Sequence, residues 1–323
     1  QDYAGAKWAL GQRLPNTTDA ALDQAFNAGR LLRTHILRPT WHFVAPADLR
    51  WMLELTGPRV HAANASMYRK LGLDQGILRK SYGVLEKALR GNQYLTRAEL
   101  ASRLDQAGIP ADGLRLGYFM MSAELDGVIC SGPRRGKQFT YALLEERASL
   151  ARQLTREEAL AELVRPYFTT RGPATLQDFT WWSGLTMADA KQGLELVKPQ
   201  FVREAINGQT YWFPLSEPGP KVEPMIAHLL PNYDEFFIGF RDRSAIGEAA
   251  KRAGIRGDHP ALIANVILID GQIVGGWKRI LKRSAVLIEL NPIIELTEAE
   301  SQAVADAANR YAGFLGLSPQ LNW

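Results

Sequence analysis

The residues best suited to chemistry stand in one short stretch, SGPRRGKQ at positions 131–138. It carries three cations, Arg134, Arg135 and Lys137, among glycine and proline residues that favour a turn. Charged groups at a turn are costly to bury, so we expect them in solvent, where they can contact an anion. Cations at the tip of a hairpin usually contact phosphates, which position a nucleic acid without specifying its sequence. The alternative is a solvated loop whose charges bind nothing.

Other chemical motifs are absent or ambiguous. The five histidines lack the spacing of a helical zinc site, and Gly275-Gly276 is followed by neither Lys-Ser nor a helix start. We therefore expect no metal, no nucleotide and no other cofactor. The adjacent acids Asp234 and Glu235 are either an acid pair or, as we favour, a turn carboxylate beside a solvated neighbour. The single cysteine, Cys130, excludes a disulfide framework and indicates a reducing cytoplasm.

The elements around the cationic turn predict how it is held. Leu114, Tyr118, Met121 and Leu125 recur at helical spacing, and Gly127 follows where a helix would end. Residues 128–130 and 139–144 are rich in strand formers, so the cations would occupy the tip of a hairpin. Thr96 and Glu99 form a capping box for an earlier helix. Two helices followed by a hairpin are typical of a winged helix; the alternative is a simple hairpin with a solvated loop.

The same order of elements occurs three times. Capping boxes at Thr175 and Thr186 precede a hairpin with an Asn207-Gly208 turn, and residues 18–44 read as helix, strand, turn and strand. The three second strands are Thr-Trp-His-Phe, Thr-Tyr-Ala-Leu and Thr-Tyr-Trp-Phe, in which the aromatic and the last residue should face inward. We predict an α+β chain of three tandem winged-helix (helix-turn-helix plus wing) domains followed by a C-terminal mixed β-meander/helix domain.

Boundaries follow from the breaks between these repeats. A first winged helix and bridging helix cover residues 1–75, a second covers 76–150, a third covers 151–215, and the C-terminal domain covers 221–323. Residues 216–220, Ser-Glu-Pro-Gly-Pro, are the clearest linker. Within the first domain we expect helices over residues 2–14 and 46–55, the latter closed by Thr56-Gly57-Pro58. The last domain should hold strands around 229–240, 266–281 and 285–290 and a capped helix over 297–315.

The composition of the chain limits the classes of protein to which it can belong. The chain has 323 residues, 46% of them hydrophobic, with a formal charge of +4 and a pI near 9.1, which permits a polyanionic partner without requiring one. No apolar run is long enough for a membrane span and no signal segment opens the chain. Because the sequence begins at Gln1, we expect a fragment whose true N-terminus is missing. We expect a cytoplasmic monomer that is nucleoid-associated when bound to DNA.

Several segments together resemble a known family. They are QDYAGAKWALGQRL, GRLLRTHILRPTWHFVAPADLRWMLELTGPRV, ICSGPRRGKQFTYALL, GPATLQDFTWWSGL and LLPNYDEFFIGF. Across nearly the whole chain the sequence is similar to the bacterial winged-helix DNA glycosylases, which excise bulky N7-alkylated purines and unhook interstrand cross-links. The resemblance implies double-stranded DNA as the partner and hydrolysis of an N-glycosidic bond as the activity.

The resemblance also implies where the catalytic site lies. The family carries a Gln-x-Gln or Gln-x-Asp motif before a helix like residues 2–14, so Gln1 stands where the second polar residue of the motif would be. An N7-alkylated purine already leaves readily because it is positively charged, so a glutamine that places a water is sufficient. His42 faces the same way as Thr40 and is a second catalytic candidate; the alternative is a strand histidine satisfied by a neighbour.

For DNA contact we select Arg134, Arg135 and Lys137 of the second wing, with Arg33 and Arg38 near the first hairpin. A second cationic cluster consists of Lys278, Arg279, Lys282 and Arg283. It is either a further DNA contact or, as we favour, a solvated hairpin edge whose charges oppose pairing with another strand. Three functions stay open: a monofunctional DNA glycosylase, a non-catalytic winged-helix DNA-binding protein that acts as a regulator, and a protein-interaction array.

Overall fold

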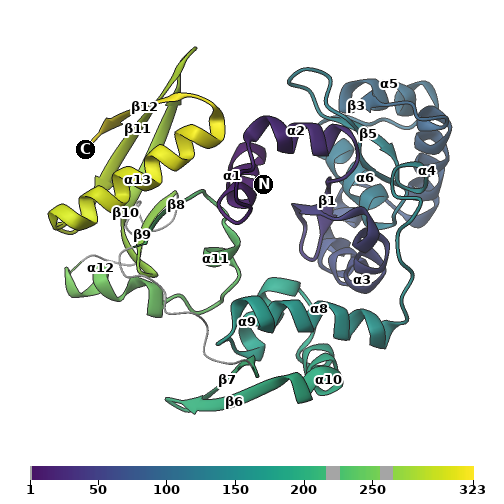
Figure 1. Cartoon of the computed structure of the whole chain (residues 1–323). Helices are drawn as coiled ribbons and strands as arrows, with labels where there is room; N and C mark the ends of the chain where they lie inside the picture. The colour runs from purple at the N-terminus through teal and green to yellow at the C-terminus, as the bar shows by residue number, and fades with distance from the viewer. Residues whose placement is uncertain (1, 216–225, 255–264) are drawn as a thin grey trace. The chain divides into compact units, whose positions relative to one another are not determined.

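The computed structural model describes residues 2–215, 226–254 and 265–323 (Figure 1). Contacts divide the chain into two compact units, one made of residues 1–23 and 215–323, the other of residues 24–214. Each unit mixes helices with strands, which confirms the α+β class. The linker at 216–220 lies outside the described residues. The boundaries at 75 and 150 stay predictions, because both fall inside the second unit.

The unit of residues 24–214 begins with the end of α2 (Asp19–Asn27) and the antiparallel pair β1 (Leu32–Ile36) and β2 (Thr40–Val44). The long helices α3 (Pro46–Lys70) and α4 (Gln75–Leu89) follow. Next come β3 (Leu95–Thr96), α5 (Arg97–Gln106), α6 (Gly113–Leu125), β4 (Ile129–Ser131), β5 (Thr140–Leu143) and α7 (Leu144–Arg147), whose three strands pair in the order β3-β5-β4.

The rest of this unit repeats the helix and hairpin order. It contains α8 (Arg156–Arg171), α9 (Leu176–Ser183), α10 (Met187–Val197), a short 3₁₀ turn (Lys198–Gln200) and the hairpin β6 (Phe201–Ile206) and β7 (Gln209–Pro214). The capping boxes at Thr96, Thr155, Thr175 and Thr186 are all formed. Asn207 and Gly208 both have positive φ, as the predicted hairpin turn requires.

Helix α3 corrects the predicted stop at Thr56-Gly57-Pro58, because it continues through Pro58 to Lys70. Proline in a helix interior costs about 3 kcal/mol or more. Burial of Leu53, Leu55 and Val60 on both sides of Pro58 offsets that cost. A side chain at Gly57 would lie 3.1 Å from the Leu125 carbonyl oxygen, so the glycine allows α3 and α6 to approach closely.

The apolar stripe predicted in α6 faces the core only in part, since Met121 and Leu125 are buried, and the inward face predicted in β7 is wrong. Leu114 in α6 is 58% exposed, while Leu116, Phe119 and Met120 are buried, because α6 packs against α3, α4 and β1 rather than against one surface. In the strand pattern, the position expected to face outward in β7 is Trp212, which is buried. All of β5 is buried, so no inward and outward faces can be distinguished there.

The other unit joins α1 (Tyr3–Gly11) to a five-stranded sheet and its helices. The strands are β8 (Ala227–Leu230), β9 (Val266–Ile269), β10 (Gln272–Leu281), β11 (Ala285–Pro292) and β12 (Ser318–Asn322), and the helices are α11 (Glu235–Ile238), a 3₁₀ turn (Ala245–Gly247), α12 (Glu248–Arg252) and α13 (Glu298–Leu315). Strands β8 to β11 form the predicted antiparallel meander, and β12, which was not predicted, pairs parallel to β11. The predicted strand around 229–240 is wrong beyond Leu230, since residues 235–238 are helical.

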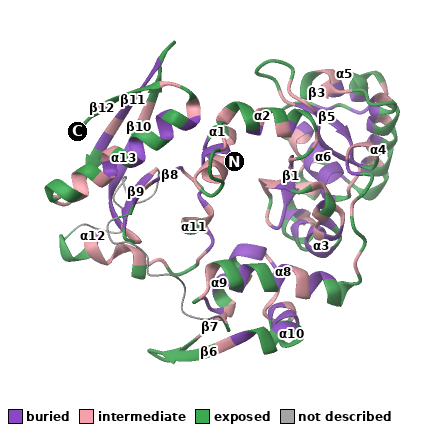
Figure 2. Ribbon diagram, in the orientation of Figure 1, coloured by how far each residue is buried: buried purple, intermediate pink, exposed green. Residues whose placement is uncertain are grey.

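The core of this unit lies between α13 and the sheet. Val304, Ala308 and Tyr311 of α13 pack with Ile267 and Val286 of the strands, and the buried side of α13 is visible in Figure 2. Helix α1 joins the same core through Trp8, although the sequence grouped α1 with the first winged helix. The Trp8 indole N–H donates to the Leu229 carbonyl oxygen at 2.6 Å. The burial of this one large side chain therefore sets where α1 packs.

Charged groups hold α1 in place as well. Lys7 is buried and its Nζ lies 2.7 Å from Asp19 and 2.9 Å from Asp23. Arg13 donates two hydrogen bonds to Asp234, at 2.7 and 3.0 Å. Asp234 also caps α11. The structural interpretation of the Asp234 and Glu235 pair is thus confirmed for Asp234.

We predict that Trp8→Ala lowers the free energy of unfolding of this unit by about 3–5 kcal/mol, because it leaves a cavity against Tyr311 and Phe314 and an unpaired carbonyl at Leu229. Urea unfolding followed by circular dichroism measures the change. Trp323→Ala is the matched control, because Trp323 is 53% exposed. Equal losses in the two variants would show that α1 is not anchored by Trp8.

Candidate nucleic-acid interface

Two of the predicted phosphate-binding arginines meet at one aromatic ring. The Arg33 guanidinium of β1 lies 4.7 Å from the centroid of the Phe139 ring and 4.3 Å from that of Trp41 in β2. The Arg134 guanidinium lies 5.2 Å from the Phe139 centroid. The Arg33 backbone N–H also donates to the Ser131 hydroxyl at 2.8 Å, which ties β1 to β4. The first hairpin and the loop between β4 and β5 therefore present their cations together.

A buried pair supports this arrangement from below. The His35 ring of β1 stacks on Trp41 with centroids 4.3 Å apart, and its Nδ1 is hydrogen-bonded to the Glu124 carboxylate of α6. Both His35 and Glu124 are buried. A carboxylate removed from water is costly unless it is paired, so this contact fixes both partners. It thereby holds the Trp41 ring on which Arg33 lies. No local pattern in the sequence indicates this pair, since its members are 89 positions apart.

The loop that carries the three predicted cations is held by its own arginines. The Arg134 backbone N–H donates to the Asn27 side-chain oxygen at 2.8 Å, and its guanidinium donates to the Lys137 carbonyl oxygen at 3.2 Å. Arg135 bonds the Glu99 carboxylate at 2.8 Å and the Tyr94 carbonyl oxygen at 2.7 Å. Glu99 compensates the charge of Arg135, so this residue anchors the loop. Lys137 is exposed near the tip.

Glu99 has two tasks in this loop. It closes the capping box with Thr96 and also receives Arg135. The hydrogen bond from the Thr96 backbone, and then those from Arg135 and the Thr96 hydroxyl, lower the pKa of Glu99 to about 2. The carboxylate is therefore ionised wherever the protein is folded at ordinary pH. It links the start of α5 to the cationic loop.

Arg33, Trp41, Arg134 and Phe139 form what we call the Phe139 cluster. Arg38, the remaining predicted contact, lies against a different ring. Its guanidinium lies 5.8 Å from the ring centroid of Trp181 in α9, and Trp181 is 46% exposed. Gly184 makes this approach possible, because a Cβ there would lie 2.7 Å from the Leu37 carbonyl oxygen. Trp181 and Phe139 were not selected from the sequence. A possible signal was the presence of aromatic residues next to segments that carry cations.

The two catalytic candidates differ in what the structure says of them. Gln1 lies outside the described residues. His42 lies in β2 with its Nε2 2.8 Å from the Thr40 hydroxyl oxygen. Thr40 is thus the neighbour that the structural interpretation of His42 requires, and the catalytic interpretation stays a prediction.

The residue after Gln1 connects α1 to the second cationic cluster. Asp2 caps α1 by accepting from the Ala4 N–H at 3.1 Å, and the Arg279 guanidinium of β10 lies 3.4 Å from its other carboxylate oxygen. Arg279 is therefore a structural partner of the start of α1. Lys278, Lys282 and Arg283 are exposed. Within the described chain, residues 278–281 pair only with β11, which fits the predicted exposed edge whose charges oppose further strand pairing.

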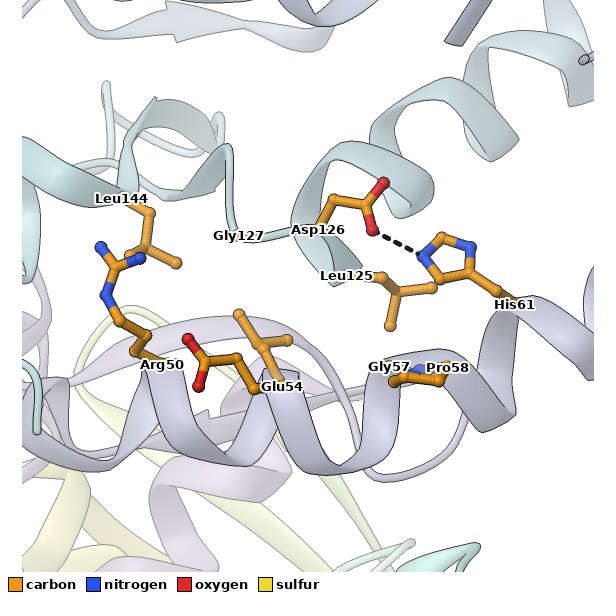
Figure 3. Close-up of a pocket in the computed structure, with 10 residues that line it drawn as sticks. Arg50, Glu54, Gly57, Pro58, His61, Leu125, Asp126, Gly127 and Leu144 are labelled. Carbon is orange, nitrogen blue, oxygen red and sulfur yellow. Dashed lines mark hydrogen bonds and ion pairs between the residues drawn. The ribbon is translucent and has the colours of Figure 1, made fainter. Parts of the chain in front are cut away.

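A cavity of about 210 Å³ between α3 and α6 brings His61 and Asp126 together (Figure 3). The His61 Nε2 lies 3.0 Å from Asp126 and its Nδ1 lies 2.9 Å from the Tyr68 hydroxyl. Tyr82 donates to the second Asp126 oxygen at 2.6 Å. Burial raises the pKa of Asp126, but the bonds from His61 and Tyr82 outweigh it and lower that pKa. Both ring nitrogens of His61 are hydrogen-bonded, so this network joins α3 to the end of α6 and to α4.

Three further observations limit the class of protein and its chemistry. Within the described residues, no group of three or more His, Cys, Asp or Glu side chains is placed to hold a metal ion. None of the described helices is both long enough and apolar enough to cross a membrane. Cys130 is buried in β4, and burial raises the pKa of its thiol to about 12, so it is not a nucleophile there.

Known proteins resemble this chain in sequence and in fold. The family model for AlkZ-like DNA glycosylases matches residues 1–314. An interstrand DNA cross-link repair glycosylase of Streptomyces sahachiroi is 23% identical over 266 residues, which cover 77% of this chain and 70% of the relative. The solved structure of Streptomyces sahachiroi DNA glycosylase AlkZ superimposes with a TM-score of 0.78 at 19% identity, over 99% of this chain and 90% of the other.

The Glu99 contacts predict a pH dependence. Because the folded-state pKa is depressed, the contribution of Glu99 to stability is present above its unfolded pKa of about 4.5 and is lost as the pH falls toward about 2. In Arg135→Ala we expect the pKa of Glu99 to rise only part of the way toward 4.5, since the Thr96 bonds remain. A carboxyl-detected NMR titration measures both values. An unchanged pKa would exclude Arg135 as a partner of Glu99 in solution, and Arg103→Ala is the control.

Proposed function

Because this chain belongs to the AlkZ-like DNA glycosylase family, we propose that it is a monofunctional DNA glycosylase acting on bulky N7-alkylated purines or interstrand cross-links in duplex DNA. The observation that carries the proposal is the length of the family match, which runs from residue 1 to residue 314. The match includes α1, which lies next to the proposed motif glutamine, and strands β8 to β11 of the sheet on which α1 packs. Cross-link repair is the activity named for the Streptomyces relative.

The proposed chemistry needs few groups. Alkylation at N7 places a positive charge on the purine, so the base departs without prior protonation. The protein then has to stabilise an oxocarbenium-like sugar and to place a water beside it. Gln1 fits the second task, since its amide oxygen accepts a hydrogen bond from water while its NH₂ group donates to a sugar or phosphate oxygen. No covalent intermediate is required, so the backbone would stay intact.

The proposed DNA-binding surface belongs to residues 24–214. We assign its architecture as three winged helices: α2 with the β1–β2 hairpin, α5 and α6 with β4 and β5, and α9 and α10 with the β6–β7 hairpin. The order of helices and hairpins supports this assignment. Arg33, Arg134 and Lys137 would contact phosphates, with Arg38 as an additional contact beside Trp181. Arg135 would position the loop through Glu99.

We predict that replacing Arg33, Arg134 and Lys137 together by alanine weakens binding to any duplex. Each lost phosphate contact should reduce the slope of log affinity against log salt by about 0.9. Fluorescence anisotropy at several salt concentrations measures the slope. The control replaces three exposed cations elsewhere, Lys70, Lys80 and Arg103. A slope equal to that of the unsubstituted protein would remove the Phe139 cluster from the interface.

We predict that Gln1→Ala slows base release from a duplex containing N7-alkylguanine by about 10²- to 10³-fold, the usual cost of losing one oriented hydrogen-bonding group at a reacting centre. Affinity for the duplex should change little. Single-turnover kinetics measures base release. A strand that stays intact after the reaction, but is cut when heated in alkali, shows that an abasic site forms without backbone cleavage by the protein. His42→Ala tests the second candidate, and a comparable loss would assign it to the site.

Gln75→Ala serves as the control, because Gln75 is an exposed glutamine of α4. If the unsubstituted protein binds both undamaged and alkylated duplexes but releases no base, the glycosylase proposal is wrong. The non-catalytic DNA-binding protein then takes its place. If it shows no salt-dependent affinity for DNA, the protein-interaction array is favoured.

A further inference from the structure

A second cavity, of about 460 Å³, lies within the unit of residues 1–23 and 215–323 and is lined by donors and cations. Its polar lining includes Gln12 and Arg13 after α1, Asn16 in the turn before α2, His228 of β8 and Arg310 of α13. Trp8 and Phe314 form part of its apolar wall. Among the described residues, the lining contains no carboxylate.

One side chain in this lining lacks a partner. The Nε2 of Gln12 is buried and has no hydrogen-bond partner among the described residues. A buried amide left in this state is costly. Rotation about the terminal bond of the side chain exchanges its nearly isosteric oxygen and nitrogen, so an N–H can be turned toward the cavity without disturbing the packing. An acceptor bound in the cavity would then pair with that N–H.

The two arginines contribute differently. Arg13 is compensated by its paired hydrogen bonds to Asp234. Arg310 donates to the Ala227 carbonyl oxygen at 2.6 Å. A carbonyl oxygen carries no net charge, so this bond orients the guanidinium and leaves its positive charge uncompensated by the bond. The cavity therefore has a fixed cation at its wall that is suited to an anion.

His228 experiences the same positive field. Burial lowers the pKa of His228, and the charges of Arg310 and Arg13 lower it further, while Asp234 acts in the opposite direction. At neutral pH the imidazole is thus uncharged and presents one N–H donor. The hydroxyl of Thr18 accepts from the Ala21 N–H and keeps its own proton for donation. The lining as a whole offers donors with a net positive charge.

We propose that this cavity is an anion site that takes a phosphate group through Arg310, Gln12 and His228. Phosphate fits because it accepts several hydrogen bonds and carries the charge that Arg310 complements. The group belongs either to a small free anion or to the DNA backbone. The inference stands on this lining alone and is independent of the glycosylase chemistry.

Calorimetric titration of the whole protein with inorganic phosphate tests the site. Saturable binding is expected, and Gln12→Met and Arg310→Gln should each weaken it about ten- to hundred-fold, the usual value of one hydrogen bond to a charged group. Arg310→Gln removes the charge and keeps an amide donor on a shorter side chain. Gln75→Met and Arg252→Gln are the matched controls, since both residues are exposed. Absence of saturable binding, or equal binding by the variants and the controls, overturns the proposal.

A second measurement is independent of folding defects. A bound phosphate dianion should raise the pKa of His228, because it favours the imidazolium over the neutral ring. NMR titration of the imidazole C–H signals with and without inorganic phosphate detects this change, and Gln12→Met should abolish it. An unchanged pKa for His228 at saturating phosphate would place the bound ion elsewhere and overturn the assignment.

The source of the phosphate is decided by duplex binding. If Arg310→Gln weakens duplex binding relative to Arg252→Gln, and inorganic phosphate competes with DNA, the group is a backbone phosphate. If duplex affinity is unchanged while binding of inorganic phosphate is lost, the site takes a free anion. Either result supports the anion site. The two measurements can be made whether or not the protein releases a base.

Discussion

The burial of Trp8 is the constraint on which the position of α1 depends. A helix of nine residues is not stable alone, so its place is set by what it packs against. The Trp8 ring packs on Tyr311 and Phe314 of α13, and its N–H satisfies a carbonyl of β8. The side chain thereby joins α1 to two elements that lie more than 200 positions away in the chain. Asp2, which caps α1, inherits its position from this contact.

Several cations of this protein form ion pairs that hold its elements together, although the net charge of the chain is small. Lys7 and Arg13 pair with acids to hold α1, Arg279 contacts Asp2, and Arg135 anchors a loop on Glu99. These contacts remove some charges from the set available to a polyanion. The attraction of the protein for a polyanion depends on where individual cations are presented, and the formal charge of +4 says little about it.

Local signals in the sequence predicted local structure well. Capping boxes such as Thr96 with Glu99 and Thr297 with Glu300 were confirmed because all of their atoms lie within one turn. Helix α3 was predicted to stop at Pro58 because a local rule cannot include the burial that offsets the proline. Strand β12 was missed for a related reason, since residues 318–322 are mostly exposed and form a strand only by pairing with β11. The cationic loop was located from the sequence, but its partners Asn27, Tyr94 and Glu99 lie in distant segments.

The meeting of Arg33 and Arg134 at Phe139 shows what such long-range contacts add. A guanidinium stacked over a ring has its N–H groups in its own plane, so the stacking surface and the hydrogen-bonding edge are separate. The ring can therefore restrict the orientation of the guanidinium without occupying its hydrogen-bonding edge. An arginine restricted in this way loses less conformational entropy on binding than a long side chain in free solution. The Phe139 cluster is therefore more than a site of positive charge, because the ring limits the directions in which the guanidinium N–H groups point. A lysine at position 33 would keep the charge but lack the planar group that stacks, and the directional restriction would be lost.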